Sequence, residues 1–203
     1  MVMSLSLGLG LNSVAMHQRA SLVIPDNGGP ELLLQAEIVN RGGQTSEGVL
    51  IQAVAIPWLE IARQLTRDPN FLFMFAQYPR KFEEFIAASY ERAGFDEVTL
   101  TPQRGDGGRD VIAVKRGHGS IRFLEQTKAY SCGHLVTHDD VRAMLGVLSV
   151  DQNASKGLIT TTSGFQPGIT KEGSEFARLM PHRLELKDGA ATAEWVKGLS
   201  ERG

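Results

Sequence analysis

The sequence has few of the features that would tie it to an oxidising compartment or a membrane. Cys132 is the single cysteine in 203 residues, so an intramolecular disulfide is excluded, as is usual in a reducing compartment. No apolar run approaches the roughly 20 residues that a membrane-spanning helix needs. The apolar opening MVMSLSLGLGLNSVAMHQR has no basic residue ahead of it, so we expect no secretory signal. These absences predict a cytoplasmic protein that has no membrane partner.

An excess of one charge is also lacking over the whole chain. The formal net charge is −2, so no global basic field points to a polyanionic partner. Locally the balance differs, because residues 101–130 hold three carboxylates and six cationic side chains, namely Arg104, Arg109, Lys115, Arg116, Arg122 and Lys128. Such an excess would attract a polyanion, although basic residues scattered along strand edges give the same count without any function.

The chain contains no internal repeat and no low-complexity tract, yet its two parts differ in pattern. In residues 1–56, the segments ELLLQAEIV and VLIQAVAI predict strands, and the turn-rich NRGGQTSEG separates them. Pro57 then allows a helix to begin at IPWLEIARQL, and Pro69 ends it. We therefore expect a small β-rich extension over residues 1–56 and a main domain over residues 57–203.

The main domain has the pattern of a mixed α/β fold. PRKFEEFIAASYERAGF places an apolar residue at each helical turn and predicts a helix that ends near Gly94. EVTLT, DVIAV and IRFLEQTK predict three strands joined by Gly-rich turns, hence an antiparallel meander. Thr137 and Asp140 form an N-terminal capping pattern for the next helix. KGLITTT and HRLELKD predict further strands, and KEGSEFARLM and AATAEWVKGL predict further helices.

Three polar residues at neighbouring strand ends point to a chemical site. Side chains alternate along a strand, so Gln126 and Lys128 of EQTK share one face, whereas Glu125 points to the other. Asp110 opens the neighbouring strand directly after the Gly107-Gly108 turn. The oxygens of Asp110 and Gln126 suit a hard cation such as Mg²⁺. The Lys128 ammonium can hold a water molecule or a phosphate and favour the charge that develops as water attacks phosphorus.

The helix before these strands offers a further carboxylate. At about 100° per residue, Glu83 lies roughly 90° from the centre of the apolar stripe, whereas Glu84 lies nearly opposite the stripe. We therefore expect Glu83 to reach the rim of the sheet and Glu84 to face solvent. In the alternative interpretation, both carboxylates only stabilise the first helical turn through the helix dipole.

Four segments, FEEFIAASYERAGF, GDGGRDVIAV, EQTK and GLITTTSGF, together resemble the catalytic domain of the Mrr-type restriction endonucleases, a branch of the PD-(D/E)xK nuclease superfamily. The resemblance covers about residues 57–200 and implies a restriction-endonuclease-like mixed central sheet flanked by helices. It also implies that Asp110 binds metal, that Gln126 occupies the Glu-or-Gln position, that Lys128 is the catalytic lysine and that Glu83 is the helix carboxylate. Arg109, rather than Pro, precedes Asp110, and the neutral Gln126 ligates a cation more weakly than a carboxylate does.

This resemblance implies a Mg²⁺-dependent endodeoxyribonuclease, with Mn²⁺ as the alternative cation, that acts on double-stranded DNA in restriction or defence. The DNA backbone would be contacted by basic residues of the same region: Arg104, Arg109, Lys115 and Arg122. Cutting both strands calls for two neighbouring sites, which is consistent with a homodimer. A second hypothesis is a catalytically weak or inactive nuclease fold that binds DNA or a protein partner. RNA as substrate is a third, because only the resemblance favours DNA.

Two other groups of residues have simpler explanations. A zinc site would need about four ligands at recognisable spacing, and no second half accompanies Cys132, His134 and His138. An aromatic platform for single-stranded nucleic acid is less favoured than an apolar core or an interface for Phe71, Phe73 and Phe75, since Leu72 and Met74 lie between them.

Overall fold

The computed structural model describes residues 30–103 and 107–202. Seven strands form one mixed sheet in the order β1-β2-β3-β4-β5-β7-β9, and β6 and β8 form a separate two-stranded pair. The bounds are β1 Val39–Gln44, β2 Val49–Ala53, β3 Glu97–Leu100, β4 Val111–Arg116, β5 Ser120–Lys128, β6 Leu135–Val136, β7 Lys156–Thr161, β8 Gly164–Phe165 and β9 Leu184–Lys187. The helices are α1 Pro30–Gln35, α2 Ala55–Arg67, η1 Pro69–Gln77 (a 3₁₀ helix), α3 Pro79–Arg92, α4 His138–Val150 and α5 Gly189–Ser200.

The sheet has an antiparallel half and a parallel half. Strands β1 to β5 pair with their sequence neighbours in antiparallel fashion, which confirms the predicted meander from β3 to β5. The chain then crosses over through α4, so that β7 runs parallel to β5 and β9 runs parallel to β7. Parallel neighbours need such a crossover because their connection must return to the starting edge. The end of β5 consequently lies beside both the start of β4 and the end of β7.

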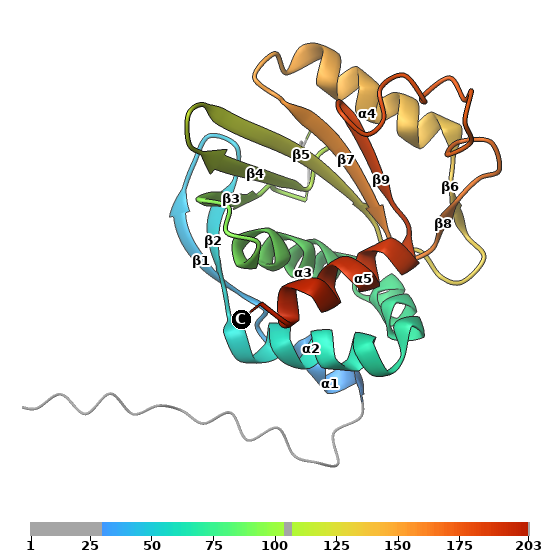
Figure 1. Ribbon diagram of the computed structural model, residues 1–203. Coiled ribbons are helices and arrows are strands. Elements are labelled where there is room, and N and C mark those ends of the chain that lie inside the picture. Colours follow the sequence, from blue (N-terminus) through green and yellow to red (C-terminus); the bar gives the residue numbers. More distant parts are fainter. Residues whose placement is uncertain (1–29, 104–106, 203) are drawn as a thin grey trace, which may run out of the picture.

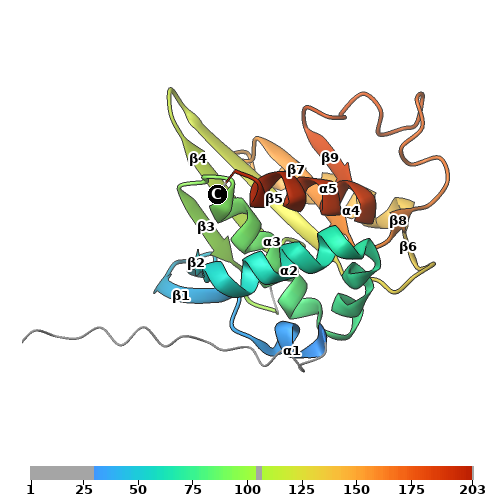
Figure 2. The same ribbon diagram turned by 60° about the horizontal axis from the view of Figure 1, so that its bottom comes forward.

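Helices cover both faces of the sheet (Figure 1). α3 and α5 pack on one face, where Val111 and Leu158 belong to the larger apolar core. α4 packs on the other face, where Ile112, Leu124 and Ile159 belong to a second core. Turned by 60°, the molecule shows α1, α2 and η1 as a further layer outside α3 (Figure 2). The predicted mixed sheet flanked by helices is confirmed.

Several local predictions are also confirmed. Phe82, Phe85, Ile86 and Tyr90 of α3 are buried, although Ala93 after the helix is exposed. Thr137 caps α4 through a complete capping box with Asp140. The aromatic segment before α3 is core, since Phe71 and Phe75 are buried within η1.

Two predictions of secondary structure are wrong. ELLLQ belongs to the helix α1, and the strand begins only at Val39, because a short apolar run is ambiguous between helix and strand until packing decides. The segment KEGSEFARLM forms consecutive turns in place of a helix. Gly173 and Ser174 interrupt it, and both residue types favour turns over helix interiors.

The described part of the N-terminal segment belongs to the same sheet and core as the rest. β1 and β2 continue the sheet beyond β3, and Leu34, Ile38 and Val39 lie in the larger apolar core. The proposed boundary at residue 56 stays a prediction. Within residues 30–103 and 107–202, every helix is too short or too polar to cross a bilayer.

Candidate active site

Asp110 lies where the turn after β3 enters β4, against the end of β5. Its backbone N–H donates to the carbonyl oxygen of Glu125 at 2.8 Å, next to the register pair formed by Val111 and Glu125. Its carboxylate Oδ2 accepts from the backbone N–H of Thr127 at 2.6 Å and from the Thr127 hydroxyl at 3.1 Å. These three bonds fix Asp110 beside the last residues of β5.

Gln126 and Lys128 alternate with these residues along β5 and share a face with Leu124, which packs toward α4. Lys128 Nζ lies 2.9 Å from Oδ1 of Asp140 in the first turn of α4. Gln126 Oε1 is buried and has no hydrogen-bond partner among the described residues. A buried oxygen of this kind normally has a donor or a cation beside it.

Glu83 comes from α3, on the opposite face of the sheet. Its side chain is only 15% exposed and forms an ion pair with Arg80 of the same helix. Arg80 also donates to the carbonyl oxygen of Thr101 at 3.1 Å, and the backbone N–H of Thr101 donates to the carbonyl oxygen of Asp110 at 3.0 Å. Arg80 and Thr101 therefore connect the predicted helix carboxylate to Asp110.

The prediction that Glu84 faces solvent is wrong. Its side chain is 8% exposed and pairs with Lys81 at 3.0 Å and with Arg41 of β1 at 3.7 Å. Lys81 also donates to the carbonyl oxygen of Ala36 at 3.0 Å. The N-terminal segment thus covers the side of α3 that a single apolar stripe predicts to be exposed.

The glycine turn before Asp110 requires glycine at both positions. Gly107 and Gly108 have φ values of +65° and +79°, which side chains rarely adopt. A Cβ on Gly108 would also lie 3.1 Å from Cγ2 of Val147 in α4. The turn is further held by Arg109, whose Nη1 lies 3.1 Å from Oδ2 of Asp151 just after α4.

Arg109, Lys115 and Arg122, the three predicted DNA-contacting cations that the structure describes, do not gather at Asp110. Arg104 lies outside the described residues. Arg109 and Arg122 both pair with Glu47 and Asp151, and the distances from Arg122 are 2.5 Å and 3.2 Å. Lys115 lies five residues beyond Asp110 on β4, about 16 Å away at 3.3 Å per residue, and donates to the carbonyl oxygen of Gly94.

Glu125 is a buried acid on the other face of β5, and no role for it was predicted from the sequence. Glu125 is fully buried on the α3 face, and its Oε2 accepts from the Tyr90 hydroxyl at 2.6 Å. The Thr160 hydroxyl lies beside this carboxylate but outside hydrogen-bond geometry. Burial raises the pKa of Glu125 from 4.5 to about 7, against the opposing effect of the Lys187 ammonium and the Tyr90 hydrogen bond. The sequence signal for this buried acid is that Glu125 shares a strand face with Phe123 and Thr127, where a charged side chain is unusual.

This raised pKa predicts a pH-dependent stability that Glu125→Gln removes. Below pH 4.5 the carboxyl is protonated in both the folded and the unfolded chain. As the pH rises toward 7, the unfolded chain loses the proton first, so the free energy of unfolding falls by about 3 kcal/mol in total. Urea unfolding in EDTA at pH 4 and pH 8 measures this loss. Equal losses in the wild type and in Glu125→Gln would contradict the assignment.

The donor set at this end of the sheet fits a hard cation that keeps several waters. Asp110 and Gln126 supply oxygens from adjacent strands, and Gln126 Oε1 has a free acceptor position. Within the two described ranges, no three His, Cys, Asp or Glu side chains cluster tightly enough to hold an ion.

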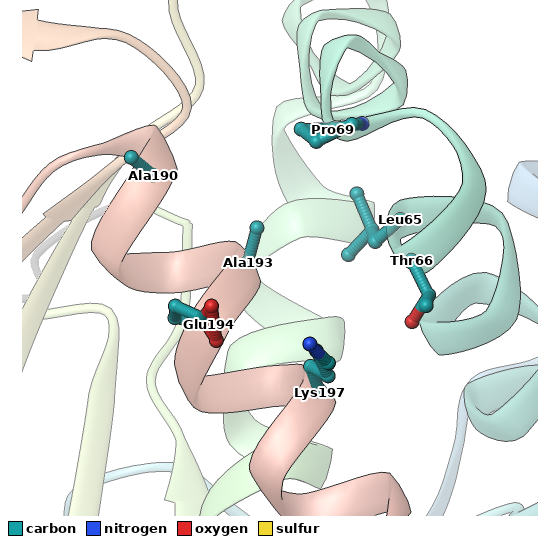
Figure 3. Close-up of a pocket in the computed structure, with 7 residues that line it drawn as sticks. All are labelled: Leu65, Thr66, Pro69, Ala190, Ala193, Glu194 and Lys197. Carbon is teal, nitrogen blue, oxygen red and sulfur yellow. The ribbon is translucent and has the colours of Figure 1, made fainter.

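A separate cavity of about 340 Å³ lies between α5 and the corner where α2 meets η1 (Figure 3). Its walls are mostly apolar, with Leu65 and Ala193 facing each other and Glu194 and Lys197 at the side. None of the predicted site residues lines it. We therefore place the candidate site at Asp110 and not in this cavity.

Comparison with known proteins gives three findings. Residues 76–196 match the family model of the Mrr catalytic domain, described as a restriction endonuclease. Over 129 residues the chain is 28% identical to the uncharacterized protein y4cE of Sinorhizobium fredii (strain NBRC 101917 / NGR234). The matched region covers 63% of this chain and 31% of that protein. The chain thus spans less than a third of this relative. The DNA modification-dependent restriction endonuclease AspBHI superposes with a TM-score of 0.42 at 16% identity, over 83% of this chain and 44% of that structure.

Proposed function

This chain belongs to the Mrr catalytic-domain family of restriction endonucleases, as its motifs predict, and from this premise we propose that it is a metal-dependent endodeoxyribonuclease that hydrolyses phosphodiester bonds of double-stranded DNA. The proposal depends most on one observation: at the start of β4, Asp110 lies against the end of β5, which bears Gln126 and Lys128. A cleavage assay with and without a chelator tests it directly.

In this proposal, Asp110 and Gln126 hold Mg²⁺, with Mn²⁺ as the alternative, and Glu83 assists from α3. The cation, when bound, would polarise the scissile phosphate and neutralise charge on its oxygens. Thr127 keeps the Asp110 carboxylate oriented through two hydrogen bonds to Oδ2. Arg80 positions Glu83 in the same way from within α3.

Lys128 holds the attacking water and stabilises the negative charge that develops on the phosphate oxygens. Asp140 keeps the ammonium group at this end of the sheet, at 2.9 Å. Burial acts to raise the pKa of Asp140, but the hydrogen bonds from Thr137 and the Lys128 ammonium outweigh it and hold that pKa below its usual value. Asp140 therefore remains ionised at neutral pH, so it can pair with the Lys128 ammonium.

The biological setting belongs to the same proposal. Restriction, or defence against foreign DNA, in the cytoplasm is the role that the family suggests. A homodimer would supply a second active site for the second DNA strand. Arg109 and Arg122 already have carboxylate partners, so a contact from either to a phosphate would require breaking those pairs.

One observation favours a second candidate function, a nuclease fold that binds DNA or a protein partner with little or no catalysis. Gln126 stands where the family more often has a carboxylate, and a neutral amide binds cations weakly. Metal dependence separates the two candidates. A binding module retains DNA equally well in EDTA and cuts it in no metal, whereas the nuclease cuts only when the cation is present.

Gln126→Glu tests the weak ligand directly. A carboxylate at this position adds a charged oxygen donor, so we expect the Mg²⁺ concentration that gives half-maximal cleavage to fall by about tenfold, or about 1.4 kcal/mol in ion binding. A Mg²⁺ titration of plasmid cleavage by both proteins measures the change. An unchanged or higher half-maximal concentration would show that Gln126 does not ligate the ion.

A further inference from the structure

A recess of about 370 Å³ lies directly beside the candidate site, between the β1–β2 turn and the N-terminal half of α3. Arg41 and Gln44 of β1 line one side, and Arg80 of α3 lines another. Leu100, Thr101 and Gln103 close it at the end of β3. The recess therefore collects side chains from three elements that are far apart in the sequence.

The polar lining of the recess consists of hydrogen-bond donors suited to an anion. Two arginines and two glutamines line it, and among the described residues no Asp or Glu does so. Arg41 is the cation best placed to take a further partner, because its side chain is 62% exposed and Glu84, its ion-pair partner among the described residues, lies 3.7 Å away. Lys81 binds the same Glu84 at 3.0 Å and so satisfies that carboxylate without Arg41.

Thr101 connects the recess to Asp110. Thr101 lines the recess, and its backbone N–H donates to the carbonyl oxygen of Asp110 at 3.0 Å. The Thr101 hydroxyl donates to the carbonyl oxygen of Arg109 at 2.7 Å. Arg80, also in the lining, bonds both Thr101 and Glu83. A strand whose scissile phosphate lay at Asp110 would therefore pass next to the recess.

The opposite wall is rigid. In the β1–β2 turn, the Thr45 hydroxyl accepts from the backbone N–H groups of Glu47 and Gly48 at 3.2 Å and 3.1 Å. Gly48 has a φ of +154°, and a Cβ there would lie 2.1 Å from the carbonyl oxygen of Leu100. The turn thus packs backbone against backbone on the end of β3, which gives the recess a fixed shape.

We propose that this recess binds a backbone phosphate that neighbours the scissile phosphate on the same DNA strand. Arg41 would be the main contact, and Gln44, Arg80 and Gln103 would be further donors. Arginine and glutamine side chains are common phosphate and sugar contacts, and such contacts set the register of the protein on the duplex. This inference rests on the proposed nuclease function, because it takes Asp110 as the place of the scissile phosphate.

Arg41→Ala tests the inference, with Arg63→Ala as the matched control. Arg63 of α2 is 64% exposed and likewise pairs with a glutamate, Glu60, but lies outside the recess. Binding of a fluorescein-labelled DNA duplex is followed by anisotropy in EDTA, so that no cleavage intervenes. We expect Arg41→Ala to weaken binding about tenfold at low salt and to reduce the slope of log Kd against log salt by about 1, with no change in Arg63→Ala.

A second variant, Gln44→Glu, places a carboxylate in the lining without removing an arginine, and we expect it to weaken binding at low salt as well. Equal affinity of the wild type, Arg41→Ala and Gln44→Glu would overturn the inference, as would a wild type that does not bind the duplex in EDTA. Equal losses in Arg41→Ala and Arg63→Ala would also overturn it. Because this assay contains no cleavage step, Arg41-dependent binding in a protein that never cuts DNA would reject the proposed nuclease and support the recess only as a site that binds a DNA phosphate.

Discussion

We expect Asp110→Asn to abolish metal-dependent DNA cleavage, with a loss of at least about 10³-fold in rate, because it removes the proposed charged ligand that directly precedes β4. Asparagine has almost the same shape and keeps an oxygen that can accept from Thr127 at the position of Oδ2. The fold should therefore survive, and plasmid cleavage under single-turnover conditions measures the effect.

Asp96→Asn is the matched control for this variant. Oδ2 of Asp96 also accepts a backbone N–H at 2.6 Å, from Arg116, at the other end of β4. We expect Asp96→Asn to cut DNA at the wild-type rate and both variants to melt within a few degrees of the wild type. Full activity of Asp110→Asn would remove Asp110 from the active site.

We expect Lys128→Ala to lower the cleavage rate by about 10² to 10³-fold while metal binding persists, since the proposed role of the ammonium is to stabilise charge that develops only during the reaction. Mn²⁺ binding, measured by calorimetry, should be retained, in contrast to Asp110→Asn. This contrast distinguishes the residue that acts on water and phosphate from the residue that holds the ion.

The control for Lys128→Ala must lose an equally buried ion pair. Lys156→Ala does so, because Lys156 is 19% exposed and lies 2.8 Å from Glu185, whereas Lys128 is 20% exposed and lies 2.9 Å from Asp140. We expect both variants to lose similar stability and only Lys128→Ala to lose activity. Parallel losses of activity would mean that Lys128 acts through the fold alone.

The sequence carries much of the information about the sheet around the site. Strand alternation and two Gly-rich turns predict that β3, β4 and β5 form a meander, which places Asp110 beside the end of β5. The same alternation puts Gln126 and Lys128 on one face. These features depend on neighbours in the chain, and local patterns therefore reveal them.

Long-range packing is what the sequence did not reveal. The burial of Glu84 depends on β1, which lies some forty residues earlier and brings Arg41 to the outer side of α3. Arg109 and Arg122 look like free cations in the sequence, yet Glu47 and Asp151 come from two separate elements to pair with them. No periodicity in either segment could signal these pairs, because each needs the complete sheet.

The pairing of Lys128 with Asp140 belongs to the same class. Asp140 is recognisable in the sequence as part of a capping box, and the structure confirms that role. Its second contact, to Lys128, arises because the crossover through α4 starts at the end of β5. A residue with an evident local role can therefore also position the proposed catalytic lysine.

The most direct test of the account is the incubation of the wild-type protein with supercoiled plasmid, methylated and unmethylated, in Mg²⁺, in Mn²⁺ and in EDTA. A metal-dependent nuclease yields nicked or linear DNA in at least one of the two metals and leaves the plasmid intact in EDTA. Intact plasmid under all conditions, with the DNA still bound in EDTA, would contradict the nuclease and establish the second candidate, a nuclease fold that only binds.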